Sequence, residues 1–183
     1  MSLPIFYPRK AERITAPASE PVTLAELKSY LYIDHSDDDD LLNRMLQAAR
    51  EAAEQFTRRS FITQTWKLTY DDNVPFHLDL PNGPVQSITS VVAEAEDTST
   101  VTVNTQAYKL LSNDVLRVEG YVSAHKVHIT YVTGYGDDAA DVPAPIRQGI
   151  AQHVAVMLEG RQVLSELPGS AISLYAPYKK LAV

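Results

Sequence analysis

The sequence contains no cysteine among its 183 residues. Disulfide bonds, thiolate metal sites and a cysteine nucleophile are therefore excluded, which favours a reducing compartment. No run of 18 apolar residues is present, so we expect no membrane-spanning helix. The first residues, MSLPIFYPRKAER, lack the long apolar stretch of a signal peptide. These absences predict a soluble, cytoplasmic product.

Basic residues are in the minority: 16 Lys and Arg stand against 23 Asp and Glu, a formal net charge of −7. Nucleic-acid binding depends on clustered Lys and Arg that neutralise phosphates, so a DNA-gripping surface is not expected. A surface that DNA passes without adhering remains compatible with this charge. With 45% hydrophobic residues, the chain can bury a substantial core, and its length suits one domain with an arm and an insertion.

Helical patterns occupy both ends of the chain. Thr23 and Glu26 match a capping box at the start of a helix over 24–31. A second helix is predicted over 37–58, because apolar residues recur there at steps of three and four. The last helix follows Pro145 and runs to about Gly160.

Between these helices the period changes to that of β-strands. Short β-branched or aromatic runs such as FITQTWKLTY and KVHITYVTGY alternate with turn signals, which predicts six or seven antiparallel strands. The expected fold class is α+β: a small helical bundle core of two N-terminal helices and one C-terminal helix, an inserted antiparallel β-sheet or sandwich, and extended terminal arms. The expected parts are an N-terminal arm 1–21, the first part of the helical core 22–60, the β region 61–135, the last core helix 136–162 and a C-terminal tail 163–183.

Four consecutive aspartates, Asp37–Asp40, precede the second helix and follow His35. A calcium loop of the EF-hand type needs acids at alternate positions and a glycine at the sixth, and neither is present. Consecutive residues entering a helix point about 100° apart, so four carboxylates cannot converge on one ion. Ser36 is a suitable N-cap with Asp39 completing a capping box, so the run is interpreted as a helix start. The alternative is a cation-dependent hydrolase or a nucleotide-binding protein that uses Asp37–Asp40 with His35.

Other catalytic motifs are missing from the sequence. No H-E-x-x-H or G-x-S-x-G is found, and Gly134-Tyr135-Gly136 is too short for a dinucleotide fingerprint. His125 and His128 lie three apart in an expected loop and strand, and are interpreted as polar surface residues instead of metal ligands. The sequence therefore predicts no enzyme, no metal and no cofactor.

The two ends of the chain carry more apolar residues than simple tails need. The arm contains Leu3, Ile5, Phe6 and Tyr7, and the tail contains Leu174, Tyr175, Tyr178 and Leu181 beside Lys179 and Lys180. Aromatic terminal segments of this kind often dock on a partner. For both ends the alternative, packing back onto the chain's own domain, remains open at this stage.

Four segments in fixed order carry a resemblance to a known family. They are VTLAELKSYLYIDHSDDDDLLNRMLQAAREAAEQFTRRSFITQTW, LPNGPVQSITSV, ITYVTGYGDDAADVPAPIRQGIAQHVAVMLEGR and APYK. The chain resembles, from about Val22 to Lys179, the head–tail connector proteins of long-tailed phages. These are also called adaptor or head-completion proteins, and related copies occur in prophages and gene transfer agents.

The resemblance implies a structural, non-enzymatic role. Members form a ring, usually of twelve copies, beneath the portal at the capsid vertex of the virion, and they join the portal to tail or head-completion proteins. DNA passes through the lumen of the ring without specific binding, and no membrane is involved. The chain would be made in the cytoplasm of the host bacterium.

Two sets of site residues follow from this family role. Leu174, Tyr175, Pro177 and Tyr178 match the family's C-terminal ending, which implies a portal-docking tail. At a boundary between ring subunits, we expect Asp37 and Asp38 of one copy to pair with Arg58 or Arg59 of its neighbour.

Overall fold

The computed structural model describes residues 10–71, 77–111, 114–118, 124–160 and 167–180. The chain divides into two compact units. The helical unit comprises Pro17–Ile62 and Tyr135–Val183, and the β unit comprises Met1–Ala16 and Thr63–Gly134. The predicted α+β class with an antiparallel β insertion between helices is confirmed.

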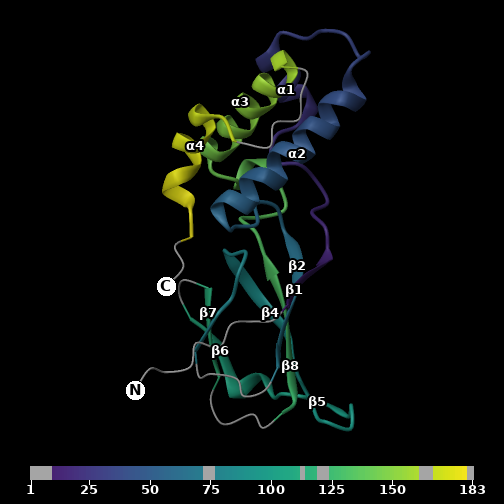
Figure 1. The fold of residues 1–183 in the computed structure, drawn as a ribbon, viewed down its shortest axis with the longest axis vertical. Helices are drawn as coiled ribbons and strands as arrows, with labels where there is room; N and C mark the ends of the chain where they lie inside the picture. Colours follow the sequence, from purple (N-terminus) through teal and green to yellow (C-terminus); the bar gives the residue numbers. More distant parts are fainter. Residues whose placement is uncertain (1–9, 72–76, 112–113, 119–123, 161–166, 181–183) are drawn as a thin grey trace. The chain divides into compact units, whose positions relative to one another are not determined.

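The helical unit contains four α-helices within the described residues (Figure 1). They are α1 (Leu24–Leu31), α2 (Asp39–Thr57), α3 (Ala144–Gly160) and α4 (Gly169–Tyr175), with 3-10 turns η3 (Ala139–Asp141) and η4 (Ala176–Tyr178). The first three match the predicted helices closely. The fourth, α4, lies within the C-terminal tail, for which no helix was predicted.

The capping box at the start of α1 is confirmed. The hydroxyl of Thr23 accepts a hydrogen bond from the backbone N–H of Glu26 at 3.2 Å, and the N–H of Thr23 donates to the Glu26 carboxylate at 2.9 Å. Two backbone donors that a helix start leaves unpaired are thus satisfied by two side chains three positions apart.

The expected cap at the start of α2 is wrong. The N-cap is Asp38, which makes no side-chain capping bond, and Ser36 lies in the preceding bend. Asp39 was expected to complete a capping box with Ser36, but its carboxylate contacts Lys28 of α1 at 2.7 Å. Asp39 therefore forms an ion pair between α1 and α2 in place of the expected capping box.

The core of the helical unit forms where α2 packs against α3. The predicted apolar stripe of α2 is buried at Leu42, Met45, Leu46, Ala49 and Ala53. The facing residues of α3 are Ile146, Ile150, Val154 and Met157. Each buried Leu, Ile, Val or Met side chain contributes about 1.5–3 kcal/mol relative to exposure, so this contact stabilises the unit substantially.

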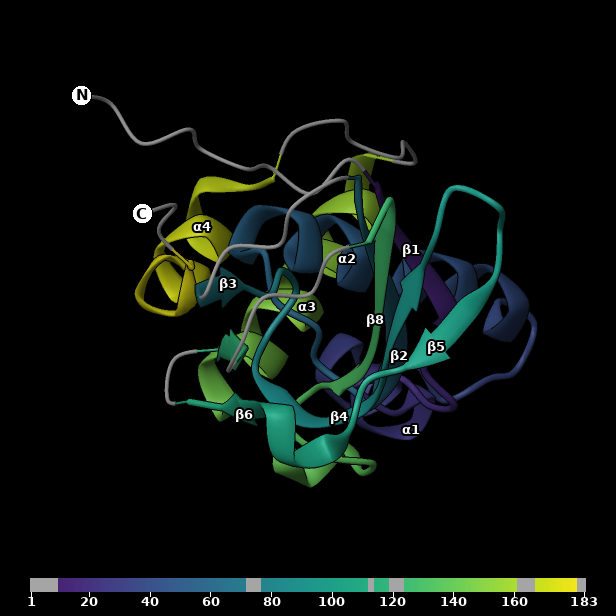
Figure 2. The ribbon, with the colours of Figure 1, turned by 90° about the horizontal axis from the view of Figure 1, so that it is seen from below.

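Within its described residues, the β unit contains two antiparallel sheets (Figure 2). The larger has the order β1-β2-β8-β4-β5 and the smaller β3-β7-β6. The bounds are β1 (Lys10–Thr15), β2 (Gln64–Asp71), β3 (His77–Asp79), β4 (Val85–Glu94), β5 (Thr100–Thr102), β6 (Tyr108–Leu110), β7 (Val115–Val118) and β8 (Lys126–Thr133), with a 3-10 turn η1 (Thr105–Ala107) before β6. Strands β2 to β8 are the seven that the sequence patterns predicted.

Both sheets contribute to one apolar core. The alternation predicted for β8 is confirmed, since Val127, Ile129 and Tyr131 are buried while the intervening residues are half-buried. Leu68 of β2 and Leu116 of β7 belong to the same cluster. The β insertion is therefore a small sandwich with its own core.

The segment LPNGPV before β4 is fixed by one acidic side chain. The carboxylate of Asp114 accepts a hydrogen bond from the backbone N–H of Val85 at 2.7 Å. The backbone carbonyl of Asp114 accepts one from the N–H of Leu80 at 2.9 Å. Gly83 is buried against this carboxylate, so that a Cβ added there would collide with it. A glycine is thus required because the Asp114 side chain occupies the space.

We expect Gly83→Ala to lower the free energy of unfolding by about 1–3 kcal/mol, because the new methyl group must displace a buried, hydrogen-bonded carboxylate. Urea unfolding of the purified chain measures this loss. Gly169→Ala is the matched control: a Cβ there meets open space, so a change within about 0.5 kcal/mol is expected. Equal effects of the two substitutions would contradict the role of Asp114.

Candidate interaction surfaces

The predicted docking tail lies on its own helices. Tyr175 of α4 is fully buried, and its ring fills the space that a side chain at Gly149 of α3 would need. Figure 1 shows α4 beside α3. Of the other predicted docking residues, Leu174 and Tyr178 are half-buried and Pro177 is exposed.

Polar contacts fix the end of this tail to the end of α2. The guanidinium of Arg59 donates to the carbonyl of Tyr178 at 2.6 Å, and the N–H of Lys180 donates to the carbonyl of Thr57 at 2.8 Å. The ammonium of Lys179 lies 4.6 Å from the centre of the Phe56 ring, a cation–π geometry. In this structure the tail therefore packs back onto the chain's own domain, which is one of the two arrangements that the sequence left open. Its docking on a partner stays a prediction.

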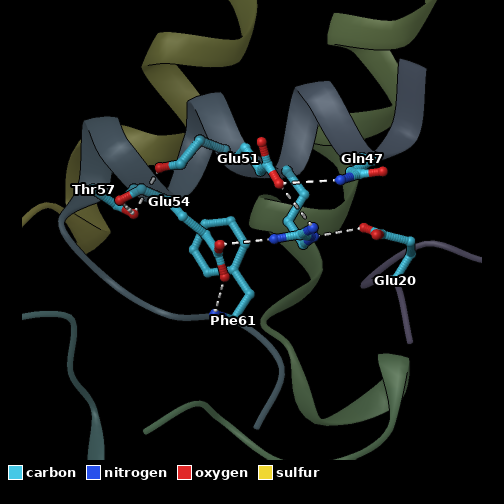
Figure 3. A network of polar contacts seen from close by, with 8 residues as sticks. Glu20, Gln47, Glu51, Glu54, Thr57 and Phe61 are labelled. Atoms are coloured by element: carbon cyan, nitrogen blue, oxygen red, sulfur yellow. Dashed lines mark hydrogen bonds and ion pairs between the residues drawn. The ribbon is translucent and has the colours of Figure 1, made fainter. Parts of the chain in front are cut away.

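A buried arginine of α2 is bonded to acidic side chains, and Figure 3 shows Glu20, Glu51 and Glu54 of this network. Arg50 is only 3% exposed. Its guanidinium donates to Glu20 at 2.8 Å and to Glu54 at 2.9 Å, and lies 3.6 Å from Glu51. The i, i+4 pair of Arg50 with Glu54 was the available sequence signal, but nothing local indicates Glu20, thirty positions away.

The charges of this network stabilise each other. Burial disfavours the charged guanidinium, but the hydrogen bond to Glu20 and the charges of Glu20, Glu54 and Glu51 together raise the pKa of Arg50. Glu54 also accepts the N–H of Phe61 at 2.8 Å. The network thus ties the segment before α1 and the segment after α2 to the same helix, which is a structural role.

Buried polar atoms also occur on α3 and α4. Among the described residues, neither ring nitrogen of His153 nor the hydroxyl of Tyr175 has a hydrogen-bond partner. His153 is 2% exposed, and burial lowers its pKa below the ordinary value of 6.5. Burial likewise raises the pKa of the Tyr175 hydroxyl. Both groups are therefore uncharged at neutral pH.

We expect His153 to make stability pH-dependent. As the pH falls below 6.5 the unfolded chain binds the proton first, so stability present above that value is lost on acidification. The loss reaches at most about 1.4 kcal/mol per pH unit from this one group. Urea unfolding between neutral and mildly acidic pH should show a smaller loss for His153→Leu than for the original chain. Identical slopes for His153→Leu and the original chain would refute the assignment.

The predicted interface residues lie at opposite ends of α2. Asp37 is exposed and Asp38 half-buried before the helix, whereas Arg58 is exposed at its C-cap and Arg59 is bonded to the tail. A helix of 19 residues is about 28 Å long, so these groups cannot pair within one chain. Their pairing between copies stays a prediction.

The structure gives the aspartate run no ligand geometry. Asp39 contacts Lys28, and among the described ranges no group of three or more His, Asp or Glu side chains is arranged to hold a metal ion. His128 of β8 lies between the hydroxyl of Thr69, at 3.0 Å, and the carboxylate of Glu94, at 2.8 Å, on a half-buried sheet face.

Over the part of the chain that the structure describes, no helix has the length and apolarity to cross a membrane.

Comparison with solved structures shows the same fold over almost the whole chain. A chain in the neck of an empty gene transfer agent particle, computed with C6 symmetry, superposes with a TM-score of 0.80 at 19% identity, covering 95% of this chain and 97% of that one. A chain in the virion of a native gene transfer agent particle gives 0.80 at 20% identity, covering 94% and 96%. A chain in the neck of a native particle, computed with C12 symmetry, gives 0.76 at 19% identity, covering 95% and 97%.

No curated protein sequence matches the chain significantly. The model of the phage gp6-like head–tail connector proteins matches residues 21–121, which is more than half of the sequence. The matched range includes α1, α2 with Arg50, Glu51 and Glu54, and most of the β insertion. This protein therefore belongs to the phage gp6-like head–tail connector family.

Proposed function

We propose that the protein forms a ring in the neck of a phage-like particle and joins the portal at the capsid vertex to tail or head-completion proteins. The observation that carries the proposal is family membership combined with a fold shared over 95% of the chain with a neck protein. That neck was computed with C6 symmetry and another with C12 symmetry. A ring of twelve copies is the form we propose for this chain.

The C-terminal tail is the part that we propose contacts the portal. Pro177 is exposed, and Leu174 and Tyr178 are half-buried, so these side chains offer a partner some surface while the tail stays on its helices. Engagement of Tyr175 requires α4 to leave α3, because its ring is buried there. Ile172, 36% exposed on α4, adds to the apolar surface that a partner would cover.

DNA passage through the ring lumen is the second element of the proposal. The net charge of −7 supports a conduit, because repelled DNA moves past the wall without sticking. A gel-shift titration at low salt should show no binding of duplex DNA. Retarded DNA at low salt would favour a packaging factor that holds DNA directly.

The ring and its partner are tested together by native mass spectrometry. The purified chain is mixed with the portal protein encoded by the same genome, and we expect a complex that carries many copies of the chain on one portal ring. Truncation after Leu167 should remove portal binding if the tail makes the contact. Detection of monomer alone, with and without portal, would refute the proposed function.

A further inference from the structure

The helical unit has a groove between α1 and α3 that no segment of the described chain fills. Its volume is about 370 Å³. Val22, Ala144 and Ala151 give it apolar walls, and the ion pair of Glu26 with Arg147 lies at its rim. Grooves with small apolar walls and a few oriented charges are typical docking sites for a side chain of another molecule.

Two exposed tyrosines lie at the C-terminal end of α1. Tyr30 lines the groove and is 41% exposed, and Tyr32, the C-cap of α1, is 95% exposed. Tyrosine is enriched at the energetically important centres of protein interfaces, because its large ring loses little conformational entropy. Together the groove, Tyr30 and Tyr32 form what we term the α1 surface.

The charge beside the α1 surface is negative. Asp34, Asp37 and Asp40 come within eight residues after Tyr32 and are exposed, and Asp38 among them is half-buried. The nearby Lys28 is engaged by Asp39, so it does not neutralise them. A partner for this surface must therefore offer cations beside apolar groups.

The C-terminal end of α2 carries cations beside apolar groups. Arg58 is exposed at the C-cap, and Lys179 is exposed above the Phe56 ring beside the exposed Pro177. We term these residues the α2 basic end. It lies about 28 Å along α2 from the acidic start of the helix, so one chain cannot bring its two surfaces together.

We propose that the α1 surface of one copy receives the α2 basic end of the next copy. Two different, complementary surfaces at opposite ends of one element make a head-to-tail contact, and a head-to-tail contact closes into a ring when its rotation allows. Tyr30 and Tyr32 supply aromatic faces for Arg58 and Lys179, and Asp37 and Asp38 supply the opposite charge. This inference rests on the proposed ring and names the surfaces that build it.

Charge reversal tests the contact in the full chain. We expect Asp37→Lys with Asp38→Lys, and separately Arg58→Glu with Lys179→Glu, each to weaken ring formation at least tenfold in the concentration required. The four changes in one chain should restore assembly, since both surfaces are then reversed. Arg44→Glu, an exposed reversal in the second turn of α2, is the matched control and should assemble normally.

Cysteine cross-linking supplies a second measurement, because the sequence has no native cysteine to interfere. Tyr32→Cys and Arg58→Cys in one chain should give a ladder of disulfide-linked copies on oxidation of assembled rings, and neither single variant should do so beyond dimers. Circular dichroism checks that each variant is folded.

The outcomes separate this inference from the proposed function. Rings that form normally in both charge-reversed variants, with no cross-linked ladder, would overturn the inference and leave the ring intact. If the acidic variant forms rings but loses the portal, the α1 surface faces a different protein and the inference is equally overturned. A wild-type chain that forms no ring with portal would instead refute the proposed function.

Discussion

Replacing Arg50 with methionine should cost the helical unit about 3 kcal/mol of unfolding free energy. Methionine has a similar length, so little packing volume is lost, but Glu20, Glu51 and Glu54 are left without the buried cation between them. Removing one partner of a buried ion pair costs about 3–5 kcal/mol, and partial exposure of Glu20 places the expectation at the lower end. Urea unfolding followed by far-ultraviolet circular dichroism measures the loss.

The control for this prediction lies on the same helix. Arg44 is exposed on α2, so Arg44→Met should change stability by no more than about 0.5 kcal/mol. Adding Glu54→Gln to Arg50→Met should recover part of the lost stability, because it removes the charge of one carboxylate that has lost the Arg50 guanidinium. If Arg50→Met and Arg44→Met had the same small effect, the network would have no share in stability.

The predictable parts of the fold were those set by local chemistry. The Thr23–Glu26 capping box needs only residues three positions apart, and it is present. The seven strands of the insertion follow from short β-branched or aromatic runs separated by turn signals, and in β8 buried and half-buried residues alternate as predicted. The apolar stripe of α2 likewise reads directly as the buried face from Leu42 to Ala53.

The parts that sequence reasoning missed depend on contacts between distant segments. Lys10–Thr15 forms the edge strand β1, yet KAERIT is charged and almost fully exposed, as suits a sheet edge that must not pair with other chains. Asp39 was assigned to a cap, but Lys28 of the neighbouring helix attracts it. Arg50 carries a charge and would be expected on the surface. It is buried where its guanidinium pairs with Glu20, which lies thirty positions away in the sequence.

The candidate site shows the same division. Aromatic residues after the last long helix indicated a segment that packs against another surface. They could not indicate whether that surface belongs to a partner or to the chain's own helices. The information lies in Gly149, whose missing side chain makes room for the Tyr175 ring. A glycine in the middle of a helix, costing up to about 1 kcal/mol relative to alanine, was the available signal.

Tyr175→Ala is the second change with a large expected effect, a loss of about 3–5 kcal/mol, because it empties a fully buried ring site between α4 and α3. Tyr175→Phe keeps the ring and removes a hydroxyl that has no partner among the described residues, so it should be neutral or slightly stabilising. Tyr32→Ala makes the same deletion at a 95% exposed position and should change stability by about 0.5 kcal/mol or less.

Combining changes on the two sides of this contact decides whether Tyr175 and Gly149 really share one space. Gly149→Ala alone should cost about 1–3 kcal/mol, because its methyl group overlaps the Tyr175 ring. In a Tyr175→Ala background the same methyl group enters the emptied site, and the cost should vanish or reverse. A double-mutant cycle measured by urea unfolding gives this coupling. Strictly additive losses would mean that the tail does not rest on α3 in solution, and α4 would then be free to meet a partner without first leaving its own helices.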